Sequence, residues 1–98
     1  MAVVVRYAPR ALGREQYEQV NQILQSHGNA DPPQELLIHV LFGEEGDMRV
    51  SEIWDSEEAW RDWYEGPLDQ ALREAGLEGF EPEVFEAHEL WGVGLQPS

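Results

Sequence analysis

The feature that most constrains the fold is the apolar run ELLIHVLF, residues 35–42. A half-exposed antiparallel strand should alternate apolar and polar side chains along its length. This strand does not alternate, because both of its faces are apolar: Leu37 and Leu41 are expected on one face, and Ile38, Val40 and Phe42 on the other. A sheet that contains this strand must therefore be covered on both faces.

The remaining sequence predicts a single α+β domain over residues 1–98, with a flexible tail at residues 92–98. Strands are expected at residues 2–8, 35–42, 48–54 and 83–91, and helices at residues 14–28 and 57–75. Gly66-Pro67 should kink or break the second helix, because proline lacks the N–H that a helix needs. The order βαββαβ predicts the ferredoxin-like arrangement, a four-stranded antiparallel sheet with both helices on one face.

Two helices can cover only one face of such a sheet. If the other face stayed bare, it would form an unusually large apolar patch. A second copy of the chain is the simplest cover, so we expect a homodimer packed sheet to sheet. The short length supports this expectation, since a domain of this size buries only about 60–65% of its unfolded surface.

Composition excludes several classes of function. The net charge of −14, with six Arg and no Lys, would repel nucleic acid and anionic membranes. The absence of Cys rules out disulfides and thiolate metal sites and suits a cytoplasmic location. The longest mainly apolar run, residues 36–42, is far shorter than the roughly 20 residues that span a bilayer.

The element order, the doubly covered sheet and the stretch EIWDSEEAW, residues 52–60, resemble the dimeric α+β barrel superfamily, and within it the antibiotic-biosynthesis-monooxygenase-like group. Members of that group often end the third strand with Glu, any residue and Trp or Tyr, followed by a short turn and a helix that opens with Glu-Ala. The matching positions here are Glu52, Trp54, Ser56, Glu58 and Ala59. The resemblance spans residues 2–91 and implies a homodimer without a cofactor that oxygenates a small aromatic or quinone-like molecule.

Two departures from the family pattern limit what the resemblance implies. Many of these proteins carry a His one turn into the second helix, where this chain has Trp63, whose bulk could fill the cavity that the relatives keep open. The relatives that degrade haem also use an Asn in the first strand, and this strand has none. Haem breakdown is therefore disfavoured.

Glu52 is the first candidate for a catalytic residue. It is expected beside Val50 and Trp54 on one face of a central strand, where a carboxylate needs hydrogen-bond donors or a proton. Its expected donors are Arg6, His39, Tyr17 or the backbone amides at residues 55–57. In the functional interpretation Glu52 handles a substrate proton. In the structural interpretation, which the recurrence of the motif among relatives of different activity favours, it fixes the strand-to-helix turn.

The second catalytic candidate is His39, and no metal site is expected. His39 and His88 lie on strands predicted at opposite edges of the sheet, about 14 Å apart, so they cannot share a metal ion within one chain. A pocket for an aromatic ligand is expected to be lined by Tyr17, Trp54, Trp63 and His88, although aromatic residues at such spacings are also common in a plain core.

Two functions remain open from the sequence. One is an oxygenase-like enzyme with a small pocket in each subunit. The other is a non-catalytic dimer that binds a small hydrophobic molecule or a partner protein. A cavity beside Glu52 or His39 would favour the enzyme, and a closed core around Trp63 would favour the second function.

Overall fold

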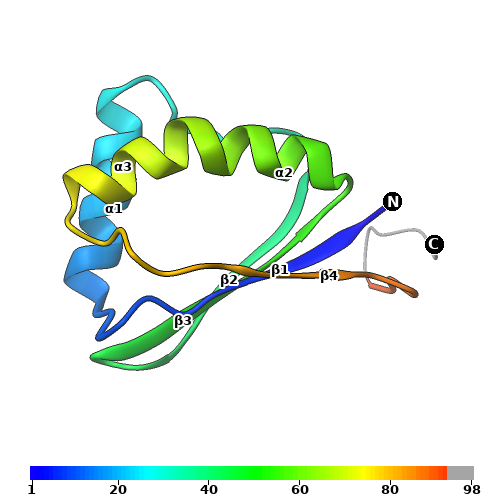
Figure 1. Cartoon of the computed structure of the whole chain (residues 1–98), viewed down its shortest axis with the longest axis horizontal. Coiled ribbons are helices and arrows are strands. Elements are labelled where there is room, and N and C mark those ends of the chain that lie inside the picture. The colour runs from blue at the N-terminus through cyan, green and yellow to red at the C-terminus, as the bar shows by residue number, and fades with distance from the viewer. Residues whose placement is uncertain (93–98) are drawn as a thin grey trace.

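A computed structural model of the chain, which describes residues 1–92, has the expected order of elements (Figure 1). The elements are β1 (Val3–Tyr7), α1 (Arg14–Ser26), β2 (Leu36–Glu44), β3 (Asp47–Trp54), α2 (Glu57–Trp63), a π-helical turn (Tyr64–Leu68), α3 (Asp69–Glu74) and β4 (Glu83–Glu86). Except for Gly92, the tail expected at residues 92–98 lies outside the described residues.

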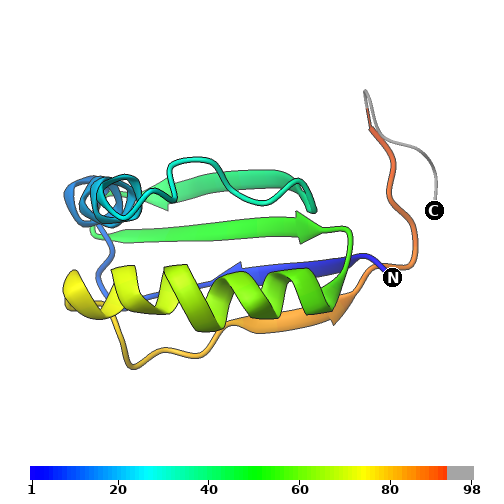
Figure 2. The same ribbon diagram turned by 90° about the horizontal axis from the view of Figure 1, so that it is seen from above.

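The four strands form one antiparallel sheet in the order β2-β3-β1-β4. Figures 1 and 2 show α1 and the α2–α3 segment on the same side of this sheet. This confirms the ferredoxin-like prediction and places β1 and β3 at the centre. We call the side that faces the helices the inner face and the opposite side the outer face.

The last strand is shorter than predicted, since β4 ends at Glu86 rather than at residue 91. In the sheet of the described residues β4 pairs with β1, and Glu86 already pairs with Val3, the first residue of that strand. Just past this pair the Ala87 amide donates to the Ala2 carbonyl at 2.9 Å. The alternating pattern continues past Glu86, but β1 offers it no further residues to pair with.

A β-bulge at Leu37 changes which side chains of β2 face the helices. The register of the β2–β3 pair shifts between Leu36 and Ile38, so Leu37 has no partner on β3. As a result Leu36, rather than Leu37, joins Leu41 in packing against the core. Ile38, Val40 and Phe42 occupy the outer face as predicted, because they pair with Ile53, Ser51 and Arg49.

The second helix changes its hydrogen-bond pattern around Pro67 but remains continuous. Residues 64–68 form a π-helical turn in which the Asp69 amide donates to the carbonyl of Tyr64, five residues earlier. Pro67 has no N–H to donate, and the wider turn accommodates its ring. The predicted interruption is confirmed, but the chain stays helical through it, as the continuous ribbon in Figure 1 shows.

The β2–β3 hairpin anchors the start of α1. The Glu45 carboxylate accepts hydrogen bonds from the Arg14 amide, at 3.1 and 3.2 Å to its two oxygens. Gly13 allows this approach, because a Cβ there would collide with the Glu45 carboxylate. A second contact, from the Met48 amide to the Leu12 carbonyl at 2.9 Å, ties the loop before α1 to β3.

The helices leave the outer face of the sheet uncovered. Val40, Phe42 and Phe85 are 44%, 38% and 49% exposed there. The inner face carries the buried core of Val3, Val5, Tyr7, Val50, Trp54 and Trp60, and a second buried cluster of Val20, Ala71 and Leu72 joins α1 to α3. The apolar character of both faces is therefore as predicted. The homodimer remains a prediction.

Candidate functional site

Glu52 lies on the inner face of β3 and is only 4% exposed. Its Oε1 accepts hydrogen bonds from the Tyr7 hydroxyl at 2.8 Å and from Trp54 Nε1 at 2.9 Å. Its Oε2 lies 2.7 Å from Nδ1 of His39. Three neutral or cationic donors thus converge on one buried carboxylate, which agrees with the predicted burial and hydrogen bonding of Glu52.

Only part of the expected set of donors surrounds Glu52. His39 is a direct partner, and Tyr17 reaches Glu52 only through His39. Arg6 pairs in register with Ser51 and so belongs to the outer face. The backbone amides at residues 55–57 make no hydrogen bond to the carboxylate.

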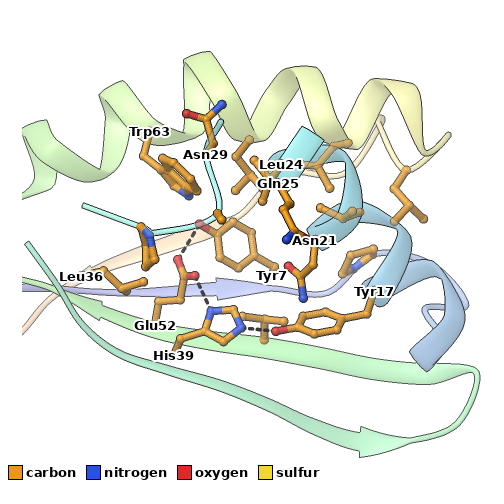
Figure 3. Close-up of a pocket in the computed structure, with 18 of the residues that line it drawn as sticks. Tyr7, Tyr17, Asn21, Leu24, Gln25, Asn29, Leu36, His39, Glu52 and Trp63 are labelled. Atoms are coloured by element: carbon orange, nitrogen blue, oxygen red, sulfur yellow. Dashed lines mark hydrogen bonds and ion pairs between the residues drawn. The ribbon is translucent and has the colours of Figure 1, made fainter. Parts of the chain in front are cut away.

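The register of β2 against β3 brings His39 to Glu52. The two residues are directly opposite each other, and cross-strand partners share a face. With Glu52 ionised, its oxygens only accept, so Nδ1 of His39 carries the hydrogen. In the neutral imidazole Nε2 then has a free lone pair, which accepts from the Tyr17 hydroxyl at 2.6 Å. Tyr17, His39 and Glu52 form one hydrogen-bonded chain (Figure 3).

Tyr7 supports the opposite side of the carboxylate. Its hydroxyl accepts from Trp60 Nε1 at 2.8 Å while it donates to Glu52. Burial raises the pKa of Tyr7 far above its usual range, and the negative charge of Glu52 raises that pKa further. Tyr7 therefore stays neutral and keeps its hydrogen for Glu52. Trp60 is held in turn by stacking on Tyr64, with ring centroids 5.2 Å apart.

A cavity of about 570 Å³ opens beside this network, between the inner face and the helices (Figure 3). Most of its wall is apolar, and Trp63 lies across the cavity from His39 and Tyr17. Its lining residues are Tyr7, Pro9, Leu12, Tyr17, Val20, Asn21, Leu24, Gln25, Asn29, Ala30, Pro32, Leu36, His39, Val50, Glu52, Trp63, Leu68, Leu72 and Leu77. Tyr17 and Trp63 both line this cavity, and Trp63 leaves its space open.

Two residues predicted to line the pocket lie elsewhere. Trp54 is fully buried and contacts the carboxylate of Glu52 through its indole nitrogen, without lining the cavity. His88 is exposed in the segment beyond the end of β4, on the opposite edge of the sheet from His39. His88 lies away from the pocket because β4 ends at Glu86, two residues before it. The strand alternation that predicted its orientation therefore does not extend to His88.

The sequence interpretation missed two groups of residues at the site. Tyr7 lies two residues after Val5 on β1, so strict alternation from Val3 would have put it on the inner face. Because three consecutive Val residues are apolar on both faces, the sequence alone did not show which face each of them occupies. The second group is polar: Asn21, Gln25 and Asn29 line the cavity from α1 and the turn after it, and a plot of apolar residues alone does not find them.

Within residues 1–92, no cluster of three or more His, Asp or Glu side chains is placed to hold a metal ion. Over the same residues, no helix is long and apolar enough to cross a membrane.

Solved structures of other proteins share the fold of this chain. No protein-family model matches the sequence, and no curated protein matches it. Among solved structures, a protein from Chloroflexus aurantiacus assigned by inference to the antibiotic biosynthesis monooxygenases has a TM-score of 0.63 and 18% identity, over 96% of this chain and 100% of its own. SnoaB, a cofactor-independent oxygenase from Streptomyces nogalater, has a TM-score of 0.53 and 21% identity, over 91% and 93%.

A dimeric ferredoxin-like protein of unknown function from Thermobifida fusca has a TM-score of 0.58 and 21% identity, over 89% of this chain and 92% of its own. A haem-degrading protein from Mycobacterium tuberculosis shares the fold as well. Identities this low show a common fold and leave activity open. The resemblance seen in the sequence is thus confirmed: the chain has the ferredoxin-like α+β fold of the antibiotic-biosynthesis-monooxygenase-like proteins.

Proposed function

We propose that the protein is a cofactor-independent oxygenase that acts on a small aromatic or quinone-like molecule bound in the cavity beside Glu52. His39 is the general base, and Glu52 orients it. One observation carries this proposal: the hydrogen-bonded chain of Tyr17, His39 and Glu52 runs along the wall of a largely apolar cavity of about 570 Å³.

The arrangement suits removal of a proton from a phenol or a similarly acidic substrate group. The Nε2 lone pair of His39 is the acceptor, and a substrate hydroxyl reaches it either in the place of the Tyr17 hydroxyl or through that hydroxyl. The imidazolium that results is stabilised by Glu52, whose Oε2 is 2.7 Å from Nδ1. Tyr7 and Trp54 donate to the other carboxylate oxygen and so fix the position of Glu52.

The deprotonated substrate can then react directly with O₂. The phenolate donates electrons to O₂ from a ring C–H carbon ortho or para to its oxygen, a C–O bond forms there, and the His39 imidazolium returns its proton to give a hydroperoxide. His39 then takes the remaining hydrogen of that carbon, the O–O bond breaks with loss of hydroxide, the carbon becomes a carbonyl, and the proton on His39 converts the hydroxide to water. One oxygen atom ends in the product and the other in water, so the reaction needs no reductant and no cofactor. The likeness to SnoaB supports this type of reaction.

A homodimer fits the same proposal. The outer face exposes Val40, Phe42 and Phe85, and a second copy packed on this face would cover them. The dimeric protein from Thermobifida fusca has the same fold.

Oxygen uptake tests the proposal. A panel of hydroxylated aromatic and hydroquinone-type compounds is incubated with the protein under ¹⁸O₂, and the products are analysed by mass spectrometry. We expect one ¹⁸O atom in the product, and His39→Gln should lower the rate about 100-fold or more, the usual contribution of a general base. His88→Gln is the matched control, since His88 is exposed and does not line the cavity. Equal rates for the two variants would contradict the assignment of His39.

The alternative is a non-catalytic dimer that binds a small hydrophobic molecule. The observation in its favour is that Nε2 of His39 already has a partner, the hydroxyl of Tyr17. Ligands that quench the fluorescence of Trp63 without any uptake of oxygen would favour this alternative.

A further inference from the structure

We propose that three side-chain amides, Asn21, Gln25 and Asn29, bind a second oxygen substituent of the substrate. We call these three residues the amide edge. The cavity would then select an uncharged aromatic molecule that carries one oxygen at His39 and another at the amide edge. This inference rests on the proposed function, because His39 is taken to bind the first hydroxyl.

The amide edge is set apart from the other polar groups of the cavity. Tyr7, Tyr17, His39 and Glu52 are committed to the hydrogen-bonded network described above. Within residues 1–92, by contrast, no protein group is hydrogen-bonded to the side chains of the amide edge. Figure 3 shows them on the helix side of the cavity, among Leu24 and other apolar residues. Asn21 and Gln25 are exposed and Asn29 is half-buried, so these amides lie at the open edge of an otherwise apolar cavity, where a ligand can reach them.

The helix spaces these amides along the length of the cavity. Tyr17, Asn21 and Gln25 are four residues apart on α1, so they share one face of the helix. At 1.5 Å per residue, Asn21 lies about 6 Å and Gln25 about 12 Å along α1 from Tyr17. A ligand whose first hydroxyl replaces that of Tyr17 therefore meets the amide edge with an oxygen at its far end.

Asn29 joins the amide edge through the turn that ends α1. Gly28 has a φ of 81°, which reverses the chain, and the Asn29 amide donates to the Leu24 carbonyl at 2.8 Å. Asn29 is half-buried and is one of the residues that line the cavity, with its amide on the side of the α2–α3 segment (Figure 3).

The charges around the cavity define the chemical class of the ligand. Among residues 1–92, no Arg lines the cavity and Glu52 supplies its one carboxylate, and the chain carries a net charge of −14. A ligand carboxylate would find no cation there other than a protonated His39. Amides donate and accept equally, so they suit a neutral hydroxyl or carbonyl group.

Binding of paired probes tests the inference without any turnover. Calorimetry compares 2-naphthol with 2,6-dihydroxynaphthalene at pH 7. In the wild type the second hydroxyl should tighten binding roughly three- to tenfold, the value of one good hydrogen bond. The double variant Asn21→Leu, Gln25→Leu should lose this gain and keep its affinity for 2-naphthol. Gln22→Leu is the control, because Gln22 is exposed on α1 outside the cavity.

A gain of function extends the test. The probe 6-hydroxy-2-naphthoate should bind the wild type more weakly than 2-naphthol, and Gln25→Arg should reverse this order by supplying a cation. Circular dichroism of each variant shows that it is folded.

Three outcomes would overturn the inference: the second hydroxyl gives the same gain in the double variant, it gives no gain in the wild type, or neither naphthol binds. The first two leave the oxygenase proposal untouched, whereas the third would also count against the binding of aromatic molecules that it requires. That proposal fails when bound aromatic compounds are not oxygenated, or when His39→Gln and His88→Gln react at equal rates.

Discussion

The two faces of the sheet are built from the same four strands but differ in burial and polarity. The inner face holds a carboxylate, Glu52, that is 4% exposed and accepts from three donors. Within the described residues, every buried side-chain nitrogen or oxygen has a hydrogen-bond partner. The outer face presents apolar side chains such as Val40, Phe42 and Phe85 to water.

In the proposed function this difference separates the reactive site on the inner face from the dimer interface on the outer face. Polar groups that are hydrogen-bonded in a buried or partly buried site interact strongly and hold fixed positions, as a reactive site requires. Apolar groups in contact with water favour association with another surface. Because strand side chains alternate, one residue step moves a side chain from one role to the other. Leu41 and Val40 are such a pair of neighbours on β2.

The largest difference between the two faces is expected when Leu41 and Val40 are each replaced by Asp in separate variants. Leu41 packs against the inner core, so Leu41→Asp should destabilise the fold by about 3 kcal/mol or more through an unpaired buried charge. Val40 is 44% exposed, so Val40→Asp should leave the fold intact and dissociate the proposed dimer.

Thermal unfolding and light scattering at micromolar concentration distinguish the two variants. Wild-type protein should scatter as twice the chain mass of 11.2 kDa, and Val40→Asp as a single chain. A wild type that scatters only as 11.2 kDa would contradict the dimer. Equal loss of stability in both variants would contradict the assignment of faces.

The next largest effect is expected at Glu52. Glu52→Ala removes the acceptor of Tyr7, Trp54 and His39 together, and should lower the free energy of unfolding by about 3 kcal/mol. Glu52→Gln keeps an acceptor for Tyr7 and Trp54 and should retain most of the stability. Denaturant titration measures both values, and a loss below about 1 kcal/mol for Glu52→Ala would contradict the buried network.

A smaller, pH-dependent effect is expected from Tyr7. Its pKa is raised in the folded protein, whereas in the unfolded chain it ionises near pH 10. The contribution of Tyr7 is therefore complete below about pH 10 and declines as the pH rises further, by about 1.4 kcal/mol per pH unit. Tyr7→Phe should show a shallower decline between pH 10 and 11.5 in denaturant titrations. Parallel slopes for wild type and variant would show that Tyr7 ionises freely.

The smallest effect concerns the hairpin that ties α1 to the sheet. Glu45→Ala removes the acceptor of the Arg14 amide and should cost about 1 kcal/mol, as loss of a helix cap does. Glu44→Ala is the control, because Glu44 is exposed and makes no such bond. Equal unfolding free energies for the two variants would mean that the hairpin does not stabilise α1.

Local patterns were enough to predict much of the inner face. The alternation of Val50, Glu52 and Trp54 depends only on the period of a strand, so the burial of Glu52 follows from the sequence. The π-helical turn at Pro67 likewise reflects one missing N–H.

Pairing between distant segments could not be predicted in the same way. His39 meets Glu52 because β2 and β3 pair in one register, and the bulge at Leu37 decides which residues before His39 share its face. The end of β4 depends on where β1 begins, which displaces His88 from the site. The amide edge depends on how α1 lies over the sheet, and no periodic pattern in the sequence records that placement.

We expect Glu52 to hold His39 in the tautomer with hydrogen on Nδ1, so that Nε2 is unprotonated and can act as an acceptor. The ¹⁵N NMR spectrum of the imidazole rings tests this expectation directly, with the signal of His39 assigned from its loss in His39→Gln. We expect a protonated Nδ1 and an unprotonated Nε2 in the neutral wild-type ring. We also expect the reverse in Glu52→Gln, whose NH₂ group would face Nδ1. A wild-type ring protonated at Nε2, or the same tautomer in both proteins, would contradict this role of Glu52.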